Sequence, residues 1–153
     1  MAGRTDFSHD EWTALRRAMI GAAVLVSMAE GGKSDMIKEM LAVSEHLLGA
    51  RRQHRSQLVR ELADITRFQS GFQTGMTAAQ YEGPVLEAIR AAMALVTARA
   101  PADAPEFRKF VVGLAETAAN ANKEGGMMGM GGTRVSPAET AAINRVRHAL
   151  GEK

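Results

Sequence analysis

The spacing of the apolar residues constrains the fold of this chain more than any other feature of its sequence. Apolar side chains recur every three or four positions, as in Trp12, Leu15, Met19, Ala23 and Val26, which places them on one face of an α-helix. No run of β-branched and aromatic residues alternates as a half-buried strand would. Aromatic residues make up only 5% of the chain, while the helix-favouring Ala, Leu and Met are frequent. The sequence therefore predicts an all-α fold.

Helix starts are marked by capping boxes, in which an N-cap residue is followed three positions later by Glu or Gln. The expected pairs are Ser8 with Glu11, Thr77 with Gln80, Asp103 with Glu106, and Ser136 with Glu139. Phe7 with Trp12 and Met76 with Tyr81 are expected to add hydrophobic staples. The predicted helices span about 9–30, 35–48, 50–68, 84–99, 104–123 and 137–150, with a short extra turn at 77–83. Gly49 and Gly83-Pro84 are expected to interrupt helices, and Gly151 to end the last one. We therefore expect residues 1–153 to form a single compact domain of five to seven helices with short connections.

Residues 18–29, "AMIGAAVLVSMA", carry no charge and follow Arg16-Arg17, which gives them the look of a secretory leader. Acidic residues upstream and the helix start at Ser8 argue against that interpretation. The run is also too short to cross a bilayer. We expect a helix that is buried on most sides.

The composition excludes several classes of chemistry. There are no cysteines, so disulfides, thiolate nucleophiles and cysteine–zinc sites are absent. The four histidines occur in no metal-binding or di-iron spacing, and no nucleophile elbow is present. The Gly-Lys-Ser at 32–34 lacks the earlier glycine of a phosphate-binding loop, because Ser27 stands there. We expect a protein that is not an enzyme and that carries no cofactor.

Two segments are candidate interaction sites. Residues 125–132, "GGMMGMGG", hold Met127, Met128 and Met130, which either fill a gap between helices or face a partner protein. Their thioethers also suit copper(I), although no His or Cys lies nearby in the sequence. The second segment is a basic run containing Arg51, Arg52 and Arg55, together with His54 and Arg60. It is interpreted as a solvated helix face balanced by Glu61 and Asp64, or else as a binding face for an anionic membrane or nucleic acid. The formal net charge is only +2, from 19 basic and 17 acidic residues, so charge does not by itself imply nucleic acid.

The end of the chain, "GGTRVSPAETAAINRVRHALG", resembles the turn-and-helix unit of TerB-like (tellurite-resistance-associated) all-helical domains. The earlier "VSMAEGGKSDMIKEML" resembles a first copy of that turn. The whole chain also resembles a related, uncharacterised family of bacterial all-helical proteins. That family has an early E-W-x-x-L, here Glu11-Trp12-Leu15, and a late G-G-x-x-V-S-x-x-E, here Gly131 to Glu139.

TerB-like domains carry an acidic residue at these two turns, and the resemblance implies a divalent-cation site using Glu30 and Asp35. At the second turn this chain has Gly131-Gly132-Thr133, without a carboxylate. The leading prediction is therefore a non-enzymatic, cytoplasmic, stress-related domain that binds or assembles with a protein partner. A cation-responsive domain is the first alternative, and a binder of an anionic surface is the second.

Overall fold

The computed structural model describes residues 2–29, 33–65, 77–121 and 136–152, and the side chains of residues 33–36 lie outside that part. Within these ranges the chain forms helices only. They are a 3₁₀ turn η1 (Arg4–Asp6) and the α-helices α1 (His9–Ala29), α2 (Lys33–Gln53), α3 (Gln57–Leu62), α4 (Ala78–Arg99), α5 (Ala104–Asn120) and α6 (Pro137–Ala149). The prediction of an all-α bundle is confirmed for the described residues.

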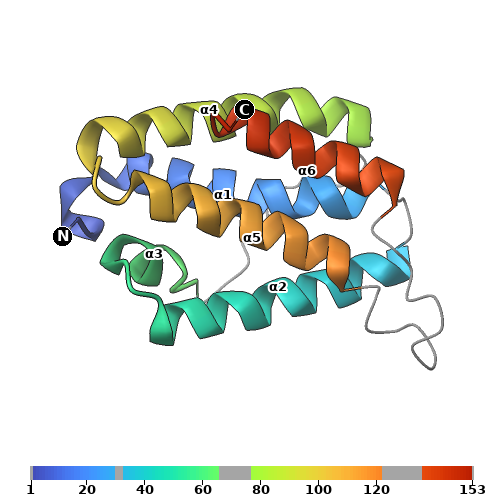
Figure 1. Cartoon of the computed structure of the whole chain (residues 1–153), viewed down its shortest axis with the longest axis horizontal. Coiled ribbons are helices and arrows are strands. Elements are labelled where there is room, and N and C mark those ends of the chain that lie inside the picture. Colours follow the sequence, from blue (N-terminus) through green and yellow to red (C-terminus); the bar gives the residue numbers. More distant parts are fainter. Residues whose placement is uncertain (1, 30–32, 66–76, 122–135, 153) are drawn as a thin grey trace.

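Helix α1 runs through the middle of the bundle, and the other long helices pack around it (Figure 1). Residues 18–27 are all buried, as expected for the uncharged run in the sequence. Helices α4 and α5 make the most extensive contacts with α1, while α6 and α2 contact it less. A segment with no polar side has to be covered from all directions, because apolar surface left in water costs about 25 cal/mol per Å². Helix α1 therefore determines how the other helices are arranged.

At three of the four predicted helix starts the N-cap hydrogen bond is present, and at Ser8 and Thr77 the reciprocal bond completes the capping box. Ser8 Oγ accepts a hydrogen bond from Glu11 N (3.1 Å), and Thr77 Oγ1 accepts one from Gln80 N (3.2 Å). Ser136 Oγ accepts from the backbone N–H of Glu139 (3.1 Å). The Phe7–Trp12 staple is confirmed by ring centroids 5.9 Å apart, whereas Met76 of the second staple lies outside the described residues. Gly151 follows α6 at φ +83°, a left-handed conformation that favours glycine.

The predicted break at Gly83-Pro84 is wrong, because α4 continues through both residues. Pro84 has no N–H to donate to the carbonyl four residues earlier, which normally ends a helix. Here the residues on either side of it pack against one point of α1. A Cβ built on Gly21 would lie 3.4 Å from both Tyr81 Oη and Val85 Cγ1. Helix α4 has to continue through Pro84 for both contacts to form.

The expected break at Gly49 is wrong for a similar reason. Helix α2 continues to Gln53, because Val43 and Leu47 before the glycine and Ala50 after it all pack against the core. A glycine inside a helix costs only about 1 kcal/mol relative to alanine. Packing against the core outweighs that cost.

The third helix is shorter than predicted. Residues 50–53 belong to α2, and α3 begins after Ser56, whose Oγ accepts from Val59 N at 3.3 Å. The backbone N–H of Ser56 donates to Nδ1 of His54 (3.0 Å), so the chain makes a tight, side-chain-capped connection there. Residues 66–68 of the predicted helix lie outside the described part.

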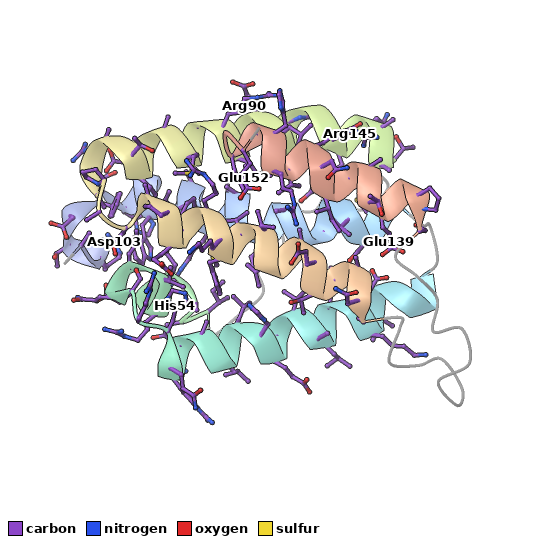
Figure 2. The ribbon with its side chains drawn as sticks, in the orientation of Figure 1. His54, Arg90, Asp103, Glu139, Arg145 and Glu152 are labelled. Carbon is purple, nitrogen blue, oxygen red and sulfur yellow. The ribbon has the colours of Figure 1, made fainter. Side chains whose placement is uncertain are left out.

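The predicted Asp103–Glu106 capping box is also wrong, since Asp103 makes no side-chain cap. Its carboxylate instead accepts hydrogen bonds from Ser56 Oγ (2.9 Å) and from the backbone N–H of Ala2 (3.4 Å). Figure 2 shows His54 and Asp103 at the same end of the bundle, where α3 meets the start of α5. Asp103 therefore ties three parts of the chain together.

None of the helices in the described part is long and apolar enough to cross a membrane.

We predict that Ser136→Ala lowers the free energy of unfolding by about 1 kcal/mol, because the N–H of Glu139 loses its acceptor. Ser136→Asp, which keeps an acceptor oxygen, is the matched control and should stay close to the wild type. Chemical denaturation monitored by circular dichroism measures both variants. Equal loss in both would contradict the capping role.

Candidate functional site

Helix α2 lies at the edge of the bundle and has only one face in the core. Its main packing partners are α5, α3 and α1, and in Figure 1 it runs along the lower edge of the molecule. Glu39, Val43 and Leu47 are buried on the inner face, with exposed fractions of 3% or less. The opposite side of α2 faces solvent, and it carries large apolar side chains that are exposed.

Three large aliphatic side chains point away from the core on α2. Ile37 is 67% exposed, Leu41 is 61% exposed and Leu48 is 50% exposed. They are four and seven positions apart, so they follow one line along the helix. We call this line of three residues the outer stripe. No other large hydrophobic side chain in the described ranges is comparably exposed.

The outer stripe corrects the sequence interpretation of α2. The helical spacing in the sequence of this segment predicts an apolar side made of Met36, Ile37, Met40, Leu41, Leu47 and Leu48. Instead Leu47 is buried, Met40 is partly buried against the core, and the stripe residues face outward; the side chain of Met36 lies outside the described part. Adjacent apolar residues lie about 100° apart around a helix, so such a set covers too wide an arc for one contact face.

The predicted basic face is not a continuous cationic surface. Arg51 pairs with Asp64 (Nε to Oδ1, 3.2 Å), and Arg55 pairs with Glu106 of α5. Arg60 donates to the backbone carbonyls of His54 (2.6 Å) and Arg55 (3.2 Å). Of the three arginines predicted to bind a partner, only Arg52 makes no ion pair with the described residues. Acidic neighbours therefore neutralise most of this charge.

On the α5 side of α2, two histidines contact one aromatic ring. His46 stacks on Phe110 with ring centroids 5.7 Å apart and planes 28° apart. His54 meets the same ring edge-on, with centroids 5.8 Å apart. Next to His46 is an open pocket of about 330 Å³ between the two helices, lined by Ala42, His46, Gly113, Glu116, Thr117, Asn120 and Ala121.

Burial lowers the pKa of both histidines. For His46, desolvation is the main cause, and the nearby charge of His54 acts in the same direction. For His54, desolvation again dominates, while the carboxylate of Glu106, with Oε2 3.8 Å from Nε2, partly opposes it. The hydrogen bond from Arg55 lowers the pKa of Glu106 in turn. Near neutral pH, this α2–α5 contact is therefore built from uncharged imidazoles.

The hydroxyl of Thr117 lies beside His46, but the hydrogen bonds there do not make His46 a general base for it. Thr117 Oγ1 donates to the carbonyl of Gly113 at 2.7 Å and lies 3.3 Å from His46 Nδ1. A hydroxyl has one proton, and the shorter bond to the carbonyl uses it. Nδ1 of His46 must then carry the proton that Thr117 accepts. This arrangement holds α2 against α5 and does not activate Thr117 as a nucleophile.

The other predicted site residues fall outside what the structure describes. Glu30, Met127, Met128 and Met130 lie outside the described residues, and Asp35 is in the first turn of α2 with its side chain not described. Within the described ranges, no group of three or more His, Cys, Asp or Glu could hold a metal ion. The cation site implied by the TerB-like resemblance therefore stays a prediction.

We predict that Leu48→Ala changes the free energy of unfolding by less than about 0.5 kcal/mol, because Leu48 is half exposed. The same substitution at its neighbour, Leu47→Ala, should cost about 2–5 kcal/mol, since Leu47 is only 3% exposed. Urea denaturation compares the two variants. Equal losses would show that the outer stripe is covered in the folded protein.

We also predict that the protein loses stability as the pH falls below about 6.5. Burial holds the folded-state pKa of His46 and His54 below the value of about 6.5 that histidine has in an unfolded chain, so the unfolded chain binds more protons in this window. Stability should therefore level off above about pH 6.5 and decline below it. Thermal unfolding at several pH values between about 7.5 and 5.5 measures the slope.

The double variant His46→Gln, His54→Gln should flatten that slope. His9→Gln, His148→Gln, which changes two exposed histidines, is the matched control and should keep it. An unchanged slope in the first variant would assign the pH dependence to other groups.

Comparison with known proteins gives no relative from which a function could be transferred. No family model, curated protein or solved structure matches this chain. The TerB-like resemblance is thus neither supported nor contradicted by these comparisons. The chain's own surface, and above all the outer stripe of α2, is therefore the best indication of its function.

Proposed function

We propose that this protein is a helical interaction domain that docks an amphipathic helix of a partner protein on the outer stripe of α2. The observation that carries the proposal is the exposure of Ile37, Leu41 and Leu48 along one line of a helix that is buried on its other side. Scattered exposed aliphatic residues are ordinary, but an aligned set on one element marks an interaction site.

The shape of the stripe favours a helix as the occupant. Ile37 and Leu48 are eleven residues apart, which is about 16 Å along a helix. A line of this length matches the apolar side of three or four turns of another helix, in the mode by which amphipathic helices occupy apolar grooves and faces. Three aliphatic anchors form a small contact, so we expect a transient complex with a dissociation constant on the order of micromolar.

The charges beside the stripe favour a protein over a membrane or a nucleic acid. Asp64 and Glu106 neutralise Arg51 and Arg55, and the exposed Glu45 lies between the remaining cations of α2. An anionic surface would be repelled by Glu45 and would find few unpaired cations. A protein helix can instead match both signs. The predicted non-enzymatic, cytoplasmic and stress-related role forms part of this proposal, as an inference from the sequence.

The test uses a yeast-displayed library of 21-residue amphipathic helical peptides as the probe. We expect enriched peptides to bind the wild-type protein and to lose at least about tenfold in affinity for Leu41→Lys, because a cation then enters the apolar contact. Ala94→Lys adds the same charge at an exposed position of α4 and is the matched control, with no expected loss.

Three outcomes would contradict the proposal. The library could yield no binders, or its binders could be indifferent to Leu41→Lys. Alternatively, vesicles of phosphatidylserine and phosphatidylcholine could bind the wild type but not Leu41→Lys, which would assign the outer stripe to a membrane surface.

A further inference from the structure

A row of three charged residues borders the outer stripe. Lys38, Glu45 and Arg52 are seven positions apart, so they lie on one edge of α2. Each is three or four positions from a leucine of the stripe: Lys38 and Glu45 flank Leu41, and Glu45 and Arg52 flank Leu48. We call these three residues the charged row.

In the described part of the chain, the charged row faces solvent. All three side chains are exposed, and none forms an ion pair or hydrogen bond within the described part of the chain. Other charged side chains of this region are engaged, as in Arg51 with Asp64 and Arg55 with Glu106. The row therefore keeps an unmatched pattern of signs, positive, negative and positive, along the edge of an apolar contact surface.

Building on the proposed docking function, we infer that the partner helix carries the complementary row of an acid, a base and an acid at the same seven-residue spacing. In paired helices, charged residues beside the apolar seam select the partner in this way. Opposite charges across the edge are favourable, and like charges placed face to face penalise the wrong partner. The stripe supplies affinity and the charged row supplies selectivity.

The same row argues against a second copy of this chain as the occupant. In an antiparallel pair centred between Leu41 and Leu48, the leucines match, but the same edge of each helix meets its counterpart. Glu45 then faces the other Glu45, and Lys38 faces Arg52. In a parallel pair the row meets the opposite edge, which carries Met40, Ser44 and Arg51 and so offers no acid. A different protein can place an opposite charge against each residue of the row, whereas a second copy of this chain cannot.

The experiment uses two synthetic helical peptides with one identical leucine stripe. The matched peptide carries acid, base and acid at seven-residue spacing on both edges, and the reversed peptide carries base, acid and base. The row has the same signs in both directions, so the result does not depend on peptide orientation. We expect the wild-type protein to prefer the matched peptide by about tenfold at low salt, which corresponds to three modest rim ion pairs. The preference should shrink at high salt.

A triple variant provides the matched control. Lys38→Glu, Glu45→Lys, Arg52→Glu keeps the stripe and reverses the row, so it should prefer the reversed peptide by a similar factor. Isothermal titration calorimetry gives the affinities, and sedimentation equilibrium of each protein alone gives its oligomeric state. We expect the wild type to sediment as a monomer.

The outcomes separate this inference from the docking function. If both peptides bind the wild type equally and Leu41→Lys abolishes both, docking stands and the selective role of the charged row is wrong. If neither peptide binds, both proposals are wrong. A wild-type dimer that Leu41→Lys dissociates would make a second copy the occupant and would overturn the inference of a different partner.

Discussion

The structure depends on the need to bury a helical segment that has no polar side. Residues 18–27 of α1 are covered from every direction, mainly by α4 and α5. This requirement explains why α4 stays helical through Pro84, since Tyr81 and Val85 both contact α1 near Gly21. It also places α2 at the periphery, where one face is enough for stability and the other is available for binding.

The fold could be predicted from the sequence wherever local rules decide the structure. Capping at Ser8, Thr77 and Ser136 depends on residues three positions apart, and all three caps are present. The predictions failed where distant residues compete. Asp103 and Glu106 have the spacing of a capping box, but Ser56 and Arg55, about fifty positions away, engage their carboxylates instead. No pattern of neighbouring residues in the sequence predicts such contacts.

The candidate site was only partly visible in the sequence. Adjacent apolar pairs such as Ile37 with Met36 and Leu48 with Leu47 show that α2 is apolar over a wide arc, but they do not show which member faces out. That choice depends on where α5 and α3 lie against α2. The arginine run and the balancing charge of Asp64 were visible in the sequence, whereas the pairing of Arg55 with Glu106 of α5 arises only in the folded chain. Arg52 is the one predicted arginine that remains part of the proposed contact.

Helix α2 also combines two kinds of surface that respond to different conditions. The outer stripe and its charged row face solvent, while His46 of α2 and His54, just after the end of α2, contact Phe110 of α5. Acidification acts on the second surface and salt acts on the charges of the first. The packing of α2 against α5 thus holds the bundle together and also keeps the outer stripe facing solvent.

The exposed aliphatic line has a practical consequence for handling the isolated protein. A formal charge of +2 gives neighbouring molecules little mutual repulsion, so the protein should tend to aggregate in concentrated solutions. Mild detergent or a short amphipathic additive that coats Ile37, Leu41 and Leu48 should keep the sample dispersed. In a crystal, we expect the same residues to be buried in a lattice contact.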